Sequence, residues 1–249
     1  MTGESRSRPS FRSRRPPPRR LRVAVDADRG PRLRAVLWDL DGTLTDSVRF
    51  VVDTANRVIA AHGGTPLDFD RVGAMTGLPL SAILRLAWPD LTAEVADAYV
   101  TEYREIYERE VIPATRLYRG TRATLHAFHQ AGLRQATVTG KRAADCERIL
   151  RGLRVTDEID AYLGGDSVQR HKPAPDLALA AAERLGVPPR DCAVIGDAPS
   201  DIEMARAAGM RAIQVTWGYS RQRLAGTDIL VRTWPELRRA VLAGAGAPV

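Results

Sequence analysis

Hydrophobic and polar positions along the chain repeat with two different periods. Residues 35–38 form an uninterrupted apolar run, which is typical of a strand buried on both faces of a parallel sheet. Between residues 48 and 59 the apolar side chains instead recur three or four positions apart, as on one face of an amphipathic helix that ends near Gly63 and Gly64. The pattern therefore predicts a buried strand that leads directly into a helix.

The segment after this helix shows further helical patterns and no strand pattern. It contains a loop rich in Gly and Pro and then two more helices, expected at residues 73–79, 81–87 and 92 to about 110. We therefore predict an inserted all-α helical cap domain at residues 47–113. Asp46 and Ser47 are expected at one of its hinges and Pro113 at the other.

After residue 113 the pattern alternates strictly between helices and short apolar strands. Helices are expected at residues 121–131, 143–151, 174–185, 200–208 and 236–242. Strands are expected at residues 135–139, 162–163, 192–195, 212–216 and 229–231. Such alternation predicts a doubly wound, Rossmann-like α/β fold, in which helices cover both faces of a parallel sheet. The core domain would comprise residues 34–46 and 114–243, followed by a short tail at residues 244–249.

The basic charge of the chain lies almost entirely in its first residues. The formal net charge is +7, but residues 1–34 hold eleven arginines against three acids, so the remainder is nearly neutral. Residues 1–33 are also rich in Pro and Ser and poor in apolar groups, which predicts a disordered tail. Such a tail could contact nucleic acid through the phosphate groups, although a solvated extension is the favoured interpretation.

The composition also narrows the expected location of the protein. No apolar run approaches the roughly 18 residues that cross a bilayer, and the first residues lack the apolar stretch of a secretory signal, so no membrane partner is expected. The two cysteines, Cys146 and Cys192, fall in a predicted helix and a predicted strand without CxxC spacing. Reduced thiols in a cytoplasmic protein are therefore expected.

Two carboxylates follow the first predicted strand. Asp39 and Asp41 are two positions apart, so their side chains share one face of an extended chain, and Gly42 then lets the backbone turn. Two acids this close repel each other unless a cation or a shared proton lies between them. Taken alone, the pattern is also typical of an ordinary turn at the end of a strand.

Other polar residues are expected at the same edge of the sheet, because ligands of doubly wound sheets bind at the carboxyl ends of the strands. Thr139 ends the second of the core strands and Asp197 the fourth. Lys172 and Asp201 stand near the starts of two helices. Singly, these residues are explained by helix capping, a turn or a solvated charge. Together, acids, a hydroxyl and an ammonium at one edge indicate a phosphoryl-transfer site with a hard cation such as Mg²⁺.

Four segments resemble the motifs of a known family: WDLDGTLTDS, VTGK, HKPAPD and IGDAPSDIEMARAAG. In this order and spacing the chain resembles the haloacid dehalogenase (HAD) superfamily over residues 35–235, in its phosphoglycolate phosphatase-like branch with a helical cap. Two positions depart from the usual pattern: Gly140 stands where many members have Asn, and His171 where Gly is common. Neither change removes a charged group that the chemistry requires.

The resemblance implies a role for each matching residue. Asp39 would be the nucleophile that forms an aspartyl-phosphate intermediate, and Asp41 would act as general acid and then as general base. The implied Mg²⁺ ligands are Asp39, the backbone carbonyl of Asp41, Asp197 and, as a ligand or a neighbour of one, Asp201. The transferring phosphoryl group would be bound by Thr139, Gly140 and Lys172.

Residues required by some branches of the family distinguish among the reactions that this resemblance allows. Residues 47–113 hold no lysine, which the phosphonate-cleaving branch requires, and the dehalogenase branch lacks the second acid, which is present here as Asp41. The resemblance therefore implies a phosphatase that hydrolyses a small phosphomonoester, with phosphoglycolate as the leading candidate. A β-phosphoglucomutase-like phosphomutase and a catalytically silent HAD-fold binding module stay open as alternatives.

Substrate choice is assigned to the cap. Thr76 and Gly77 lie in its Gly-rich loop, and Arg49 could bind a substrate carboxylate through its guanidinium fork. Loop structure and a surface charge explain these residues equally well. The expected partner is a small phosphorylated metabolite, and the protein is expected to be a monomer or a homodimer.

Overall fold

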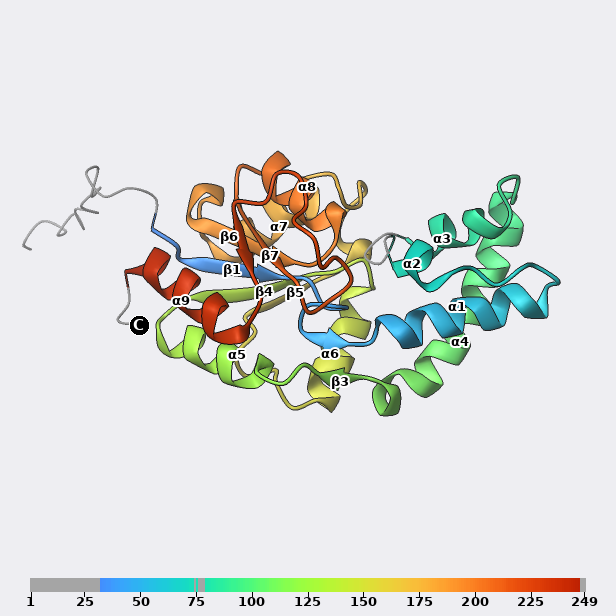
Figure 1. Cartoon of the computed structure of the whole chain (residues 1–249), viewed down its shortest axis with the longest axis horizontal. Helices are drawn as coiled ribbons and strands as arrows, with labels where there is room; N and C mark the ends of the chain where they lie inside the picture. Colours follow the sequence, from blue (N-terminus) through green and yellow to red (C-terminus); the bar gives the residue numbers. More distant parts are fainter. Residues whose placement is uncertain (1–31, 74, 76–78, 247–249) are drawn as a thin grey trace, which may run out of the picture. The chain divides into compact units, whose positions relative to one another are not determined.

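A parallel sheet of six strands lies at the centre of the folded part of the chain (Figure 1). The structure, a computed structural model, describes residues 32–73, 75 and 79–246. The strands of the sheet are β1 Ala35–Trp38, β4 Arg134–Val138, β5 Ala161–Leu163, β6 Cys192–Gly196, β7 Arg211–Val215 and β8 Ile229–Val231. Their order is β5-β4-β1-β6-β7-β8, and every neighbouring pair is parallel. The chain thus builds outward from β1 to β5 and then crosses back to build β6 to β8, which confirms the predicted doubly wound α/β fold.

Helices cover both faces of this sheet. They are α5 Thr121–Gln130, α6 Ala143–Gly152, α7 Asp176–Leu185, α8 Pro199–Ala207 and α9 Trp234–Ala245, with short 3-10 turns at Gly165–Ser167 and Pro189–Asp191. Because successive strand residues point to opposite sides, Val36 and Trp38 of β1 pack in one apolar cluster with residues of α5, α6 and α9. Ala35 and Leu37 pack in the other cluster, with residues of α7 and α8. All four side chains are fully buried, which is why β1 shows no polar alternation.

The predicted helical cap is present between β1 and β4 (Figure 1). Its helices are α1 Val48–Ala61, α2 Phe69–Gly73, α3 Leu80–Ala87 and α4 Ala93–Ala114. A short antiparallel ladder, β2 Thr45–Asp46 paired with β3 Arg116–Leu117, joins the points where the chain enters and leaves these helices. No helix of the described residues, the 22-residue α4 included, is long and apolar enough to span a lipid bilayer.

Four elements differ from the sequence-based prediction for physical reasons. α4 was expected to end at about residue 110 but continues to Ala114, with Pro113 in its last turn. α2 begins ahead of the expected loop, and the ladder of β2 and β3 was not predicted. Elements of two to five residues are too short to show a hydrophobic period, and the pairing of β2 with β3 joins segments about 70 positions apart.

The two ends of the described chain also lie outside the predicted core boundaries. Leu33, expected in the tail, is buried, and its backbone N–H donates to the carbonyl of Gly244 at 2.9 Å. α9 extends to Ala245, past the expected end of the core at residue 243. Apolar contact between these two ends therefore extends the core at both, while residues 1–31 of the predicted basic tail lie outside the described residues. The described residues form one compact unit, and their division into core and cap domains stays a prediction.

Candidate active site

Three of the predicted acids meet at the carboxyl edge of the sheet. Asp39 follows β1, where its backbone N–H donates to the carbonyl of Ile195 on the neighbouring strand β6. Asp197 follows β6 directly, and Asp201 lies in the first turn of α8. Each of these acids offers a carboxylate oxygen, and the three atoms lie within 4.8 Å of one another. The parallel register of β1 and β6 thus gathers three buried carboxylates, which are called the acid triad below.

Lys172 lies among the acids of the triad. Its Nζ is 2.8 Å from Oδ1 of Asp39 and 2.6 Å from Oδ1 of Asp201, and its side chain is 1% exposed. The loop that leads into α7 carries this lysine into the site. The second oxygen of Asp201, Oδ2, accepts a hydrogen bond from the backbone N–H of Ala198 at 3.1 Å. Both oxygens of Asp201 are therefore engaged, which makes it a support for Lys172.

Asp41 lines a cavity of about 340 Å³ beside the triad. Its Oδ1 accepts a hydrogen bond from the hydroxyl of Ser47, and its Oδ2 lies 2.8 Å from Nζ of Lys141. Burial acts to lower the pKa of Lys141, but Asp41 together with Tyr107 and Tyr103 outweighs it, so the pKa is raised and the ammonium stays charged. The cavity is bounded on one side by cap helices α3 and α4 and on the other by the loop after β4, which includes Gly140.

Thr139 and Gly140 follow β4 at the same edge of the sheet. Thr139 is buried, and its Oγ1 accepts a hydrogen bond from the backbone N–H of Lys141 at 3.3 Å. Gly140 lines the cavity together with Asp41. Both residues therefore lie where the sequence placed them, and their role in binding a phosphoryl group stays a prediction.

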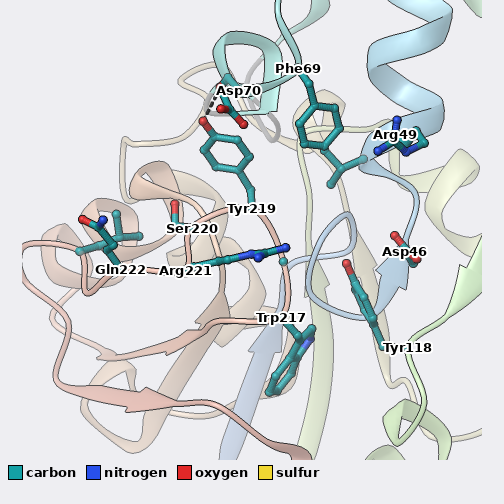
Figure 2. Close-up of a pocket in the computed structure, with 13 residues that line it drawn as sticks. Asp46, Arg49, Phe69, Asp70, Tyr118, Trp217, Tyr219, Ser220, Arg221 and Gln222 are labelled. Carbon is teal, nitrogen blue, oxygen red and sulfur yellow. Dashed lines mark hydrogen bonds between the residues drawn. The ribbon is translucent and has the colours of Figure 1, made fainter.

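Of the cap residues predicted to choose the substrate, the structure describes only Arg49. Thr76 and Gly77 fall outside the described residues. Arg49 lines a second cavity of about 790 Å³, where its guanidinium carbon lies 5.4 Å from the centre of the Phe69 ring (Figure 2). Asp41 lines the smaller cavity, which is therefore the candidate active-site cavity although the second cavity is larger. The role of Arg49 in binding a substrate carboxylate stays a prediction.

Sequence reasoning missed two residues, Tyr219 and Lys141. Tyr219 lines the larger cavity, and its hydroxyl donates to the backbone carbonyl of Asp70 in the cap (Figure 2). Its backbone N–H donates to Oδ2 of Asp197 at 2.6 Å, so the loop after β7 joins the cap to the acid triad. No local pattern marks Tyr219. Lys141 had a signal, because it is one of only two lysines among 37 basic residues.

Known proteins match the chain over most of its length. The profile of the haloacid dehalogenase-like hydrolases matches residues 36–215, which include every strand-end residue described above. A phosphoglycolate phosphatase of Xylella fastidiosa is 37% identical over 186 residues, which cover 75% of this chain and 81% of that protein. The chain belongs to the haloacid dehalogenase-like hydrolase family.

Solved structures agree with this membership of the HAD-like hydrolases. A putative haloacid dehalogenase-like hydrolase of Bacteroides fragilis superposes with a TM-score of 0.77 at 27% identity, covering 82% of this chain and 99% of that chain. A β-phosphoglucomutase of Clostridium difficile reaches a TM-score of 0.73 at 17% identity, covering 86% and 97%. The second likeness shows the fold alone.

If all its acids were ionised, the acid triad of this HAD-like hydrolase would carry more negative charge than Lys172 balances. Burial raises the pKa of Asp39 well above its ordinary value; Lys172 opposes the rise, and the other two acids add to it. Burial and then the charge of Asp201 raise the pKa of Asp197 to about 7. For Lys172, burial acts to lower the pKa, but Asp201 and Asp39 outweigh it and the pKa is raised. A further cation is needed if all three acids are to be ionised at neutral pH.

Mg²⁺ fits the residues present. The triad supplies only carboxylate oxygens, which are the ligands that this ion prefers. Glycines surround the acids closely: a Cβ at Gly42 or Gly218 would overlap the carboxylate of Asp197, and one at Gly196 would overlap Asp201. Backbone without side chains thus forms a narrow, oxygen-lined cradle around the triad.

Gly42→Ala is expected to lower hydrolytic activity on the order of 100-fold, because displacing a reacting group by about 1 Å has an effect of this size. The matched control is Gly132→Ala. Both glycines have positive φ, +84° and +77°, so alanine adds similar backbone strain, but a Cβ at Gly132 meets nothing within 4 Å. Initial rates and melting temperatures of both variants test this. An equal loss of activity in the two would show that strain, and not contact with Asp197, is responsible.

Stabilisation by Mg²⁺ is expected to increase with pH. The folded, metal-free protein retains a proton on Asp197 up to about pH 7, whereas the unfolded chain releases it near its ordinary pKa, so metal-free stability falls as pH rises through this range. A bound Mg²⁺ would require ionised carboxylates and would have to displace these protons at low pH. Melting temperatures with Mg²⁺ and with EDTA should therefore differ little at about pH 5 and most at about pH 8. A shift of equal size at both pH values would contradict this protonation.

Proposed function

We propose that this phosphatase of the HAD-like hydrolase family is a Mg²⁺-dependent enzyme that hydrolyses a small phosphomonoester of the phosphoglycolate class. The observation that supports it most is the meeting of Asp39, Asp197 and Lys172 at one sheet edge, from three segments far apart in the sequence. The phosphoglycolate phosphatase among the relatives supports the substrate class.

The proposed reaction has two displacement steps at phosphorus. In the first, a carboxylate oxygen of Asp39 forms a bond to phosphorus while the bond to the ester oxygen breaks, and Asp41, which carries a proton in the substrate complex, donates it to that leaving oxygen. In the second, Asp41 accepts a proton from water while the water oxygen bonds to phosphorus and the acyl-phosphate bond to Asp39 breaks. Inorganic phosphate leaves, and both acids return to their starting states.

Other residues of the chain hold these reacting groups in place. Ser47 and Lys141 contact the two oxygens of Asp41, which fixes the direction of its carboxylate. Lys172, beside Asp39, is placed to offset charge on the transferring phosphoryl oxygens, and the hydroxyl of Thr139 is the second ligand that we assign to them. Cap helices α3 and α4 line one side of the cavity, where they are assigned to exclude bulk water.

The proposed Mg²⁺ would be held by the side chains of Asp39 and Asp197 and the backbone carbonyl of Asp41. Asp201 is assigned to hold Lys172, because both of its oxygens already accept hydrogen bonds. When bound, the ion supplies positive charge that stabilises the gathered carboxylates and the phosphoryl oxygens.

A phosphate-release assay tests the proposal. The purified protein with Mg²⁺ is expected to hydrolyse 2-phosphoglycolate and p-nitrophenyl phosphate, and EDTA is expected to stop both reactions. Interconversion of hexose phosphate isomers without net phosphate release would replace the proposal with a phosphomutase. Inertness toward a broad panel of phosphomonoesters would replace it with a binding module.

We extend the proposal to a cytoplasmic enzyme that acts on a small phosphorylated metabolite as a monomer or homodimer. Cys146 and Cys192 are both buried and unpaired, which agrees with a reducing compartment. Cell fractionation and light scattering of the purified protein test the location and the oligomeric state.

A further inference from the structure

Lys141 presents an ammonium group beside the predicted general acid. Its side chain is 13% exposed, and its Nζ lies 2.8 Å from Oδ2 of Asp41, the one carboxylate it pairs with among the described residues. An ammonium has three N–H donors, so Asp41 does not use all of them. Lys141 also lines the cavity into which the leaving group of a substrate would project.

Tyr107 of the cap helix α4 brings a buried hydroxyl to the same place. The residue is 5% exposed, and its Oη has no partner of ordinary hydrogen-bond geometry among the described residues, with Lys141 as the polar group that interacts with it. The centre of its ring lies 4.4 Å from Nζ of Lys141, and the ring stacks on Tyr103 at 5.6 Å. Buried polar groups without a partner are rare in native proteins, so this hydroxyl indicates a ligand atom that it would bind.

We propose that Lys141 and Tyr107 bind a carboxylate on the leaving group of the substrate. This inference rests on the proposed function, because it takes Asp41 as the residue that protonates the leaving oxygen. The group attached to that oxygen then lies next to Asp41, within reach of Nζ of Lys141. In a phosphorylated 2-hydroxy acid one carbon separates the carboxylate from the ester oxygen, so the carboxylate meets an ammonium and a hydroxyl donor together.

Two arginines line the same cavity and compete with Lys141 for a substrate carboxylate, and the ring of His171 lines it as well. Arg142 is already engaged, because its guanidinium lies 2.7 Å from both Asp145 and Glu108. Arg104 lies on the exposed side of α4, so its charge is screened by water. Lys141 combines burial with contact to the proposed acid, Asp41. We therefore assign the substrate carboxylate to Lys141 and not to Arg104.

The experiment compares 2-phosphoglycolate with ethyl phosphate, which has the same two-carbon chain and no carboxylate. The discrimination ratio is kcat/KM for the first substrate divided by kcat/KM for the second. The wild-type ratio is expected on the order of 100, since a site built to bind a charged group rejects an analogue that lacks it. Because Lys141 also contacts Asp41, its removal should slow the hydrolysis of both substrates. This common loss cancels in the ratio, so a change in the ratio reports carboxylate binding alone.

Three variants test the assignment. Lys141→Met is expected to bring the ratio below about 10, and Tyr107→Phe to lower it about fivefold, chiefly through KM for 2-phosphoglycolate. Arg104→Met, the matched control, should leave the ratio within about twofold. Tyr107→Phe removes one hydroxyl and keeps the ring packing, so it tests the proposal even if Lys141→Met fails to fold.

Each other outcome overturns the inference. Ratios unchanged in both Lys141→Met and Tyr107→Phe would remove these residues from substrate binding, and a collapse in Arg104→Met would assign the carboxylate to Arg104. A wild-type enzyme that hydrolyses both substrates equally well would disprove carboxylate recognition and leave the phosphatase function intact. Failure to hydrolyse any phosphomonoester would instead disprove the proposed function, and this inference with it.

Discussion

Asp39→Asn is expected to lower kcat about 10⁴-fold or more for every phosphomonoester, because the amide cannot form the covalent intermediate. The replacement is nearly isosteric, and Lys172 keeps a carbonyl oxygen to which it can donate. The fold should therefore survive. Phosphate release under single-turnover conditions measures the loss, and trapping of ³²P from a labelled substrate should detect phosphoprotein in the wild type alone.

The matched control for this variant is Asp53→Asn. Asp53 is an exposed acid on cap helix α1, so its replacement changes the net charge equally without touching the site. Its activity is expected to stay within about twofold of wild type. Retention of substantial activity by Asp39→Asn would contradict a nucleophilic role for Asp39 and would move the reaction to another group of the site.

Lys172→Met is expected to lower the free energy of unfolding by about 3–5 kcal/mol, the usual cost of removing one partner of a buried ion pair. For a chain of this size that corresponds to a fall in melting temperature of roughly 10 °C. The reason is that Asp39 and Asp201 both lose the ammonium that lies within 2.8 Å of them. Activity should fall as well, because the same ammonium is assigned to the phosphoryl oxygens.

The loss of stability in Lys172→Met should depend on pH in a defined direction. The pKa of Lys172 is raised above its ordinary value, so the ammonium is charged and contributes fully at neutral and acidic pH. The buried acids have raised pKa values and can take up protons as pH falls, which relieves their repulsion. The variant should therefore be least stable, relative to wild type, at about pH 8 and recover toward about pH 5.

Arg170→Met supplies the control for removing a cation from the same loop. Arg170 forms an ion pair with Asp176 at 2.9 Å, but its side chain is 73% exposed. Exposed pairs contribute little, so a change of less than about 1 kcal/mol is expected, with little dependence on pH. A similar small effect in Lys172→Met would show that the triad is neutralised by its own protons and that Lys172 contributes little.

Local patterns predicted the helices and strands of the core with small errors at their ends. The apolar run of β1 and the glycines that end helices are strong signals, because burial on both faces and positive φ restrict the residue types allowed. α2, β2 and β3 were missed because each is too short to show a period. The end of α4 was placed near residue 110, whereas the helix continues to Ala114 and its last turn accommodates Pro113.

The sequence by itself determined which residues stand at the strand ends, and hence the meeting of Asp39 and Asp197, because in a parallel sheet those ends share one edge. Only the tertiary structure decided how the charges pair: Lys172 with Asp39 and Asp201, and Lys141 with Asp41. Both lysines lie within or beside motif segments, and nothing in the local sequence indicates which acid each lysine pairs with. The contact of Tyr107 with Lys141 depends on how α4 is oriented against the core. Packing between segments more than 30 positions apart determines that orientation.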